Sequence, residues 1–287
     1  MDLVNHLSDR LLFAIPKKGR LQQATLDLLA GSDIQFRRET RLDIALVKNL
    51  PIALIFLPAA DIPTFVGEGR VDIGITGADQ VAEHDAKLLP GEQSGVEQNV
   101  VTSFTGLTEE YFAKLEGVEG RVETVNGSAI KIARLRTKIK FVGGSVEAAC
   151  ALGVADGIVD LVESGETMRA AGLKAIDTVV ESSAVLIKSR HASNAKLANL
   201  IQVRIRGIIT AQRYVLCQYN ISRDKLAEAT SITPGRRAPT ITSLEEPGWV
   251  AVSSMVEKNR IASAMDDLAG VGATDVLVLE ISNSRTI

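Results

Sequence analysis

The last third of the sequence carries the pattern that most restricts the possible folds of this chain. From residue 209 to residue 281, apolar runs alternate with helical spacings in the order strand, helix, strand, strand, helix, strand. The strands are predicted at 209–219, 239–244, 249–256 and 274–281, and the helices at 223–230 and 260–268. This βαββαβ order predicts a small, compact domain that is separate from the rest of the chain.

An order of this kind is the split pattern of a ferredoxin-like domain, which we expect at residues 211–287. Such modules are more often regulatory or interaction units than catalytic ones. Because a fold alone does not determine an activity, the chemistry has to be sought in particular residues upstream.

Upstream, strand and helix patterns alternate in two blocks. In the first block, strands are predicted at 11–16, 52–57 and 71–76, with helices at 22–31 and 61–67. The second block covers residues 99–171 and is interrupted by a polar and basic stretch at 116–138, which we interpret as a surface insertion. Repeated alternation predicts α/β domains with mainly parallel sheets, which bind ligands at the carboxyl ends of their strands.

The composition excludes several classes of protein. With 46% hydrophobic and 23% charged residues in 287, the chain is globular rather than disordered. A formal charge of −3 predicts no polyanion-binding surface, so we expect no nucleic-acid partner. The two cysteines cannot form a disulfide framework, and no leader peptide or membrane-length apolar run is found. We therefore expect a cytoplasmic protein without a membrane partner.

Residues 157–168 (GIVDLVESGETM) form an apolar strand that runs into a turn rich in glycine and hydroxyl side chains. Gly165 lets backbone N–H groups approach a ligand, and Ser164 and Thr167 add hydroxyls at the start of a helix. These features suit a phosphate group. The other reading is that Ser164 or Thr167 only caps the helix, with Glu166 stabilising its first turn.

Two carboxylates, Asp160 and Glu163, lie beside this loop, although a phosphate alone would not favour negative charge there. The pair fits a ligand that also brings hydroxyl groups or Mg²⁺, such as a sugar phosphate. The alternative is a pair of solvated carboxylates at the end of a strand.

Residues 17–20 (KKGR) follow the first predicted strand, at the sheet edge where ligands bind. This cation cluster can hold nucleotide phosphates or stabilise a departing pyrophosphate, although a solvated charged surface has the same composition. The three histidines, His6, His84 and His191, are dispersed. Neither a metal cage nor a histidine-based nucleophile is therefore predicted.

The phosphate loop belongs to a longer motif with fixed spacing. Its specified positions are Glu147, Gly153, Ala155, Ile158, Asp160, Leu161, Ser164, Gly165, Thr167 and Met168. This spacing resembles the long signature of the ATP phosphoribosyltransferases, the enzymes that open histidine biosynthesis. The resemblance extends over almost the whole chain, including PKKGRL, VDIGITGADQV and ITPGRRAPT. The chain is similar to the long, fungal form of the family.

The resemblance implies a transferase that moves the phosphoribosyl group of phosphoribosyl pyrophosphate (PRPP) to N1 of ATP, with Mg²⁺ and release of pyrophosphate. It implies a bilobal catalytic part like that of periplasmic binding proteins, with lobe I at 1–96 and 183–210 and lobe II at 97–182. It also implies a homo-oligomer, a dimer or a hexamer, and feedback inhibition by histidine through the domain at 211–287.

The family motif assigns roles to residues of this chain. It implies that the ribose and 5′-phosphate of PRPP are held by Asp160, Glu163, Ser164, Gly165, Glu166 and Thr167. It also implies that Mg²⁺ is bound mainly by the substrate phosphates, and that Glu147 contributes through Mg²⁺ or hydroxyl contacts. It implies that Lys18, Gly19, Arg20, Gly77 and Asp79 line the ATP side. Asn220, Arg236, Thr240 and Ala273 match positions that bind histidine, with a solvated turn as the alternative for Arg236.

One interval departs from the family. Between the segments that match residues 77–83 and 100–104, members carry a glycine-containing turn and a strand that crosses between the lobes, whereas this chain has only KLLPGEQSGVEQN. We therefore predict that a strand is missing in the interval 84–98. Two rival readings follow: a catalytically impaired regulatory paralogue, and a solute-binding or sensor protein of the same bilobal architecture.

Overall fold

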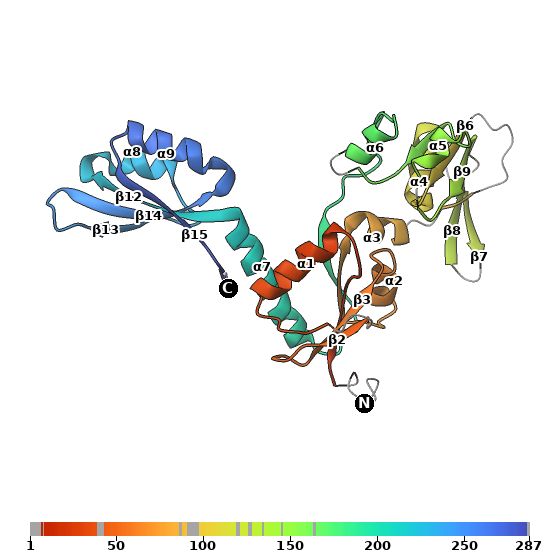
Figure 1. Ribbon diagram of the computed structural model, residues 1–287, viewed down its shortest axis with the longest axis horizontal. Coiled ribbons are helices and arrows are strands. Elements are labelled where there is room, and N and C mark those ends of the chain that lie inside the picture. The colour runs from red at the N-terminus through yellow and green to blue at the C-terminus, as the bar shows by residue number, and fades with distance from the viewer. Residues whose placement is uncertain are drawn as a thin grey trace. The chain divides into compact units, whose positions relative to one another are not determined.

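The computed structural model describes residues 7 and 9–285, except 39–42, 86–87, 91–97, 119–120, 126–127, 134, 145 and 163–164 (Figure 1). The chain forms two compact units. One comprises Met1–Phe13, Lys18–Ile55 and His191–Ile287, and the other comprises Ala14–Lys17 and Phe56–Arg190. Among the described residues, no helix combines the length and the apolar character needed to cross a membrane.

Five strands form one sheet in the order β11-β4-β1-β3-β2. They are β1 (Leu11–Pro16), β2 (Ile44–Leu46), β3 (Ile52–Leu57), β4 (Ile73–Gly77) and β11 (Ala184–Lys188). The predicted strands at 11–16 and 52–57 are confirmed, whereas β2 has three residues and too short a pattern to be found from the sequence. The two outer pairs, β11 with β4 and β2 with β3, are antiparallel. Helices α1 (Arg20–Gly31), α2 (Ile62–Gly67) and α3 (Ala78–Asp85) follow β1, β3 and β4.

The second predicted block contains a parallel sheet in the order β10-β6-β9. Its strands are β6 (Gln98–Thr102), β9 (Thr137–Phe141) and β10 (Gly157–Val159), and each precedes a helix: α4 (Thr105–Leu115), α5 (Ala148–Ala151) and α6 (Glu166–Ala170). This alternation confirms the predicted strand and helix order of the block.

The stretch at 116–138, which we interpret as a surface insertion, contains regular strands. It contains a hairpin of β7 (Arg121–Val125) and β8 (Ser128–Ala133), and β8 also pairs with β5 (Leu88–Pro90), which lies in the interval thought to lack a strand. The charged residues in RVETV and SAIKIA hid a strand pattern of period two. The carboxylate of Glu116 accepts hydrogen bonds from the backbone N–H groups of Arg136 (2.6 Å) and Thr137 (2.9 Å), which fixes the start of β9.

The predicted strand at 209–219 is wrong in its first five residues, which belong to helix α7 (Ala195–Arg213). Ile208, Ile209 and Thr210 are β-branched and favour strands by themselves. Helical spacing nevertheless continues through the buried residues Ile201, Ile205 and Ile208, and packing of this face decides the structure. Strand β12 (Tyr214–Ser222) begins directly after the helix.

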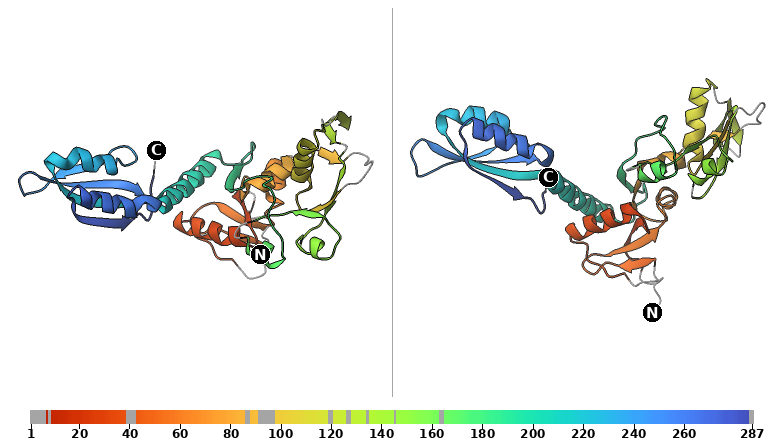
Figure 2. Two further views of the ribbon diagram at one scale, coloured as in Figure 1. Left: turned by 90° about the horizontal axis from the view of Figure 1, so that it is seen from above. Right: turned by 45° about the horizontal axis from the view of Figure 1, so that its top comes forward.

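The C-terminal sheet has the order β13-β14-β12-β15 and is antiparallel throughout. Its elements in chain order are β12, α8 (Leu226–Ile232), β13 (Thr240–Ser243), β14 (Trp249–Glu257), α9 (Ile261–Gly270) and β15 (Thr274–Glu280), as predicted. Both helices lie on one face of the sheet (Figures 1 and 2). The core between them includes Val215, Cys217, Tyr219 and Leu268.

Candidate active site

Asp160 directly follows β10 and begins the loop that leads to α6. Its exposed side chain accepts a hydrogen bond at Oδ1 from the backbone N–H of Leu161 (2.8 Å). Desolvation raises the pKa of Asp160, and although the Leu161 N–H lowers it, the negative charge of Glu147 adds to the rise. The structure therefore brings the carboxylates of Asp160 and Glu147 within electrostatic reach of each other.

Packing beneath the two carboxylates keeps them at one edge of the β10-β6-β9 sheet. Val146 and Ala149, on either side of Glu147, are buried with Val101 of β6, and Ile158 of β10 packs against this cluster. The Thr102 hydroxyl donates a hydrogen bond to the carbonyl of Val159 (2.8 Å), which ties β10 to β6 immediately before Asp160.

The loop after Asp160 contains the predicted phosphate ligands. Gly165 precedes α6 with φ at 72°, a left-handed conformation that favours glycine. The side chains of Glu166 and Thr167 are exposed, so the Thr167 hydroxyl is accessible from solvent. Glu163 and Ser164 lie outside the described residues.

The basic loop connects β1 to α1. The backbone N–H of Lys17 bonds to the carbonyl of Leu57 (2.8 Å), and Gly19 turns the chain into the helix with φ at 85°. Lys18 and Arg20 have exposed side chains. Lys18, Gly19 and Arg20 belong to one compact unit, and Gly77, Asp79 and Asp160 belong to the other, so their meeting around one substrate stays a prediction.

Asp79 lies in the first turn of α3 and is only 6% exposed. Its carboxylate accepts hydrogen bonds from the hydroxyl of Ser182 and from the amide of Gln80 (2.7 Å), and Ser182 Oγ in turn accepts from the Asp79 N–H (3.1 Å). Asp79 thus orders the start of α3. Sequence reasoning missed Ser182, because a contact over this distance in the chain leaves no local pattern.

Glu83, near the end of α3, caps the next helix. Its carboxylate accepts hydrogen bonds from the backbone N–H groups of Gly106 (2.9 Å) and Leu107 (2.8 Å), at the start of α4. Glu109, one turn further, is 5% exposed. Burial and then the charge of Glu83 raise the pKa of Glu109 to about 7. Sequence reasoning singled out neither residue.

No group of three or more His, Cys, Asp and Glu side chains suited to a metal ion occurs in the part of the chain that the structure describes. Asp160 and Glu147 supply two carboxylates. Such a pair fits an ion such as Mg²⁺, which is usually bound by one or two carboxylates together with substrate phosphates.

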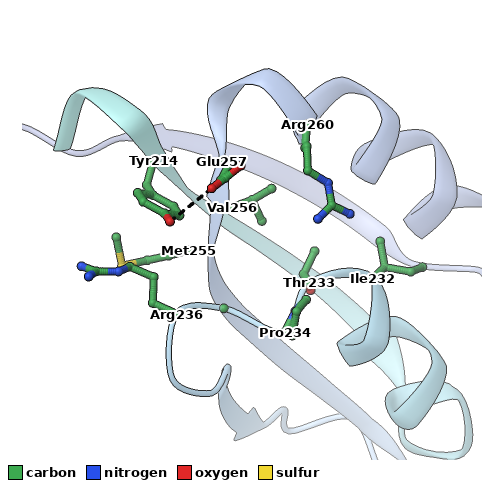
Figure 3. A pocket seen from close by; sticks show the side chains of 10 residues that line it. Tyr214, Ile232, Thr233, Pro234, Arg236, Met255, Val256, Glu257 and Arg260 are labelled. Atoms are coloured by element: carbon green, nitrogen blue, oxygen red, sulfur yellow. Dashed lines mark hydrogen bonds between the residues drawn. The ribbon is translucent and has the colours of Figure 1, made fainter. Parts of the chain in front are cut away.

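The C-terminal domain contains a pocket of about 340 Å³ (Figure 3). The predicted residue Arg236 lines it, together with Tyr214, Thr233, Glu257 and Arg260, which the sequence did not indicate. The guanidinium of Arg236 lies 5.6 Å from the centre of the Tyr214 ring, and the Tyr214 hydroxyl donates to Glu257 Oε1 (3.3 Å). Aromatic, cationic and anionic groups therefore meet in one pocket.

The other three predicted histidine-binding residues lie elsewhere in the domain. Asn220 pairs in register with Thr274, next to Ala273, and its amide donates to Asp275 (3.0 Å). At about 3.3 Å per residue, Asn220 is roughly 20 Å along β12 from the pocket residue Tyr214. Thr240 begins β13 and is exposed. Within a single chain, Asn220 and Ala273 therefore do not share a site with Arg236, whereas Thr240 pairs with Ser253, two residues before the lining residue Met255.

Comparison with known proteins decides the family. The family described as "ATP phosphoribosyltransferase" matches residues 58–95 and 86–210, and "HisG, C-terminal domain" matches residues 211–283. The ATP phosphoribosyltransferase of Yarrowia lipolytica is 56% identical over 313 residues, covering 99% of this chain and 100% of the relative. The chain belongs to the ATP phosphoribosyltransferase family.

Other members of the family agree. The ATP phosphoribosyltransferases of Saccharomyces cerevisiae and Schizosaccharomyces pombe are 52% and 53% identical over 308 and 320 residues, with 99% of this chain and 100% of each relative covered. Among solved structures, the "ATP phosphoribosyl transferase (HisG:HisZ) complex from Thermotoga maritima" has a TM-score of 0.51 at 23% identity, covering 68% of this chain and 98% of that one. This likeness concerns the fold.

The alignments with the relatives also bear on the shortened interval. Each runs over more positions than the 287 residues of this chain, so the relatives contain residues that have no counterpart here. The family match is split into two stretches that meet at residues 86–95. This junction falls within the interval 84–98, where the sequence predicts a missing strand.

Proposed function

We propose that this chain catalyses transfer of the phosphoribosyl group of PRPP to N1 of the adenine of ATP, with release of pyrophosphate, as the first step of histidine biosynthesis. The observation that carries the proposal is the electrostatic influence of Glu147 on Asp160, at the start of a loop whose exposed Thr167 follows seven residues later, on a chain of this family. Glycosyl transfer from a sugar pyrophosphate depends on groups that position the ribose and its phosphate, and carboxylates and hydroxyls can serve in that role.

Asp160 and Glu163 are assigned to the ribose hydroxyls, and Ser164, Gly165, Glu166 and Thr167 to the 5′-phosphate. Asp160 and Glu147 are the residues that would hold Mg²⁺ together with the substrate phosphates. Bound there, the ion would offset the negative charge of the pyrophosphate leaving group. The exposed cations Lys18 and Arg20 are placed on the ATP side, with Gly19 and Gly77 shaping that side and Asp79 ordering the start of α3.

The reaction requires no strong base from the protein. Adenine N1 is unprotonated at neutral pH and attacks the anomeric carbon with its own lone pair, while the bond to pyrophosphate breaks. The task of the protein is to align two polyanions and stabilise the charge that develops between them. The histidines His84 and His191 are dispersed in the sequence, which agrees with a reaction that needs no histidine base.

For the whole molecule we propose two catalytic lobes of the periplasmic-binding-protein type, at 1–96 with 183–210 and at 97–182, and a ferredoxin-like regulatory domain at 211–287. The order β13-β14-β12-β15 and the βαββαβ succession support the last assignment. We further propose a homo-oligomer, a dimer or a hexamer, that works in the cytoplasm.

Histidine is the proposed feedback inhibitor. Arg236, which lies over the Tyr214 ring, offers a partner for its carboxylate group, and Glu257, which also pairs with Arg213 (2.6 Å), offers one for its amino group. Asn220 and Ala273 lie too far along the sheet from this pocket to join it in the same chain, so they are assigned to a part of the site supplied by a second copy. Thr240, which pairs with Ser253 two residues before the lining residue Met255, is assigned to the rim of the pocket.

A direct assay tests the proposal. Purified chain is mixed with ATP, PRPP and Mg²⁺, and the ultraviolet absorbance of the N1-ribosylated adenine is followed, with inorganic pyrophosphatase drawing the reaction forward. Asp160→Asn should lower kcat/KM for PRPP about 100-fold or more, and Asp267→Asn, an exposed change on α9, should have no effect. No product from the unaltered chain would instead favour the regulatory paralogue, and binding of a sugar or amino acid without turnover would favour the sensor.

A further inference from the structure

Helix α7 carries a glycine at a place where the C-terminal tail of the chain crosses it. A Cβ on Gly207 would lie 2.0 Å from the carbonyl oxygen of Ser284, and the side chains of Asn283 and Arg285 also lie against this position. Glycine is a poor helix former, yet Gly207 occupies the interior of a 19-residue helix. The close approach of the tail explains the glycine, because any side chain there would displace the tail.

The same tail reaches helix α1. The Asn283 amide donates a hydrogen bond to the carbonyl of Gly31 (3.3 Å), the last residue of α1. Arg204 of α7 donates to the carbonyl of Ser32 (3.1 Å) directly after it. The carbonyl groups at the end of a helix have no partner within the helix, so these contacts supply bonds that α1 cannot make itself.

Helix α1 connects this contact to the predicted ATP side. It has 12 residues, which at 1.5 Å per residue makes a rod of about 18 Å. Its first residue is Arg20, and Lys18 and Gly19 precede it. Thr25 and Leu29 are almost fully buried, so packing anchors the middle and the C-terminal half of the helix. The tail, α7 and α1 all belong to the same compact unit.

The C-terminal domain is joined to α1 and α7 through two neighbouring strands. Strand β12 continues directly from α7, and β15 continues into the tail. The two strands pair with each other, for example Leu216 with Leu279. A shift of this sheet would therefore move the end of α7 and the tail together.

We propose that Asn283, on a tail seated against Gly207, is a positioning residue that holds the C-terminal end of α1 and thereby sets Lys18 and Arg20 for ATP. The tail is also the contact through which the C-terminal domain acts on ATP use. This inference rests on the proposed transferase function and deepens it, since it concerns how that site is regulated.

Two variants of the full chain test the contact from opposite sides. Gly207→Ala places a methyl group against the tail while favouring the helix, and Asn283→Asp removes the amide donor without changing the shape of the side chain. Asn283→Gln keeps the donor. The matched controls are Gly270→Ala, where a Cβ meets no atom within 4 Å, and Ser282→Ala on the exposed tail.

Both test variants should raise KM for ATP about threefold to tenfold, leave KM for PRPP within about twofold, and weaken inhibition by histidine, as expected when a coupling contact is lost. Asn283→Gln, which keeps the amide donor, should largely retain the KM for ATP and the histidine inhibition of the unaltered chain. The controls should behave as the unaltered chain. A rise of both KM values together, or a fall of kcat alone, would contradict a positioning role directed at ATP.

Hydrogen exchange of the backbone amides provides a readout that does not require turnover. Gly207→Ala should release the tail and speed exchange at 32–34, whose N–H groups bond to carbonyls of the last turns of α1, and in the first turn of α1, where the Gln22 N–H bonds to the Gly19 carbonyl. If the tail is released and the first turn of α1 stays as protected as before, the inference is wrong. If the unaltered chain forms no product but exchange spreads along α1 as expected, the proposed function fails and the mechanical link stands.

Discussion

The carboxylate of Asp79 folds back over Gly77, so closely that a Cβ on Gly77 would lie 2.1 Å from Asp79 Oδ1. The hydroxyl of Ser182 holds the carboxylate in that position. Glycine at residue 77 is therefore required by a neighbour two positions along the chain, and the two residues act as one unit at the point where β4 passes into α3.

Gly77→Ala should destabilise the chain by about 1–3 kcal/mol, because the methyl group forces Asp79 away from Ser182 in a closely packed site. If this turn shapes the ATP side, KM for ATP should rise as well. Urea unfolding measures the first effect and initial rates the second. Gly270→Ala, which meets open space, should change neither. Unchanged unfolding of Gly77→Ala would show that the turn relaxes freely and that the unit is not rigid.

The buried carboxyl of Glu109 should make stability depend on pH. Its pKa is about 7 in the folded chain, because of burial and the charge of Glu83, against an ordinary value of 4.5. The folded state then binds the proton more tightly than the unfolded state. The stabilisation is fully present below about pH 4.5 and is lost as pH rises through 7, with a total on the order of 3 kcal/mol.

Glu109→Gln, which cannot ionise, should flatten this pH dependence and make the chain more stable than the unaltered protein at pH 8. Thermal or urea unfolding between pH 5 and 8 measures the difference. The neighbouring change Glu110→Gln is the control and should keep the original slope. An unaltered slope in Glu109→Gln would mean that another group titrates in this range.

Thr167→Ala should weaken use of PRPP more than binding of ATP. The exposed hydroxyl is assigned to the 5′-phosphate, and a hydrogen bond to a charged group contributes about 1.5–3 kcal/mol, roughly tenfold to 150-fold in KM for PRPP. Titration calorimetry with each substrate separates the two affinities. Thr178→Ala, outside the loop, serves as the control. Equal losses for both substrates would contradict the assignment of the loop.

The sequence predicts those parts of the fold that have a local period. Strands β1 and β3 and the βαββαβ succession were found because apolar residues repeat within a few positions. The last five residues of helix α7 were assigned to a strand because β-branched residues favour strands locally, whereas the packing of Ile205 and Ile208 is a tertiary effect. The hairpin of β7 and β8 was missed because charged residues interrupt its apolar positions.

The candidate site divides in the same way. Asp160 and Glu147 belong to one motif, so the family resemblance assigned both to the same site, and Glu147 does act electrostatically on Asp160. Ser182, which holds Asp79, and Glu257, which bonds to Tyr214, are linked to their partners only by folding. A residue that supports a site from another element has no signature in a single sequence, because the chain gives no record of which distant segments meet.

Arg236→Ala should weaken inhibition by histidine while leaving uninhibited turnover unchanged. The guanidinium lines the pocket and lies over the Tyr214 ring, so its loss removes both a charge for the histidine carboxylate and one wall of the site. The concentration of histidine that halves the rate should rise about tenfold or more. Arg237→Ala provides a matched control, since this exposed neighbour does not line the pocket.

Tyr214→Phe separates the contributions further. It keeps the ring but loses the hydrogen bond to Glu257, so inhibition should weaken less than in Arg236→Ala. If Arg236→Ala and Arg237→Ala weaken inhibition equally, the effect arises from the overall charge of the turn, and the pocket is not the histidine site.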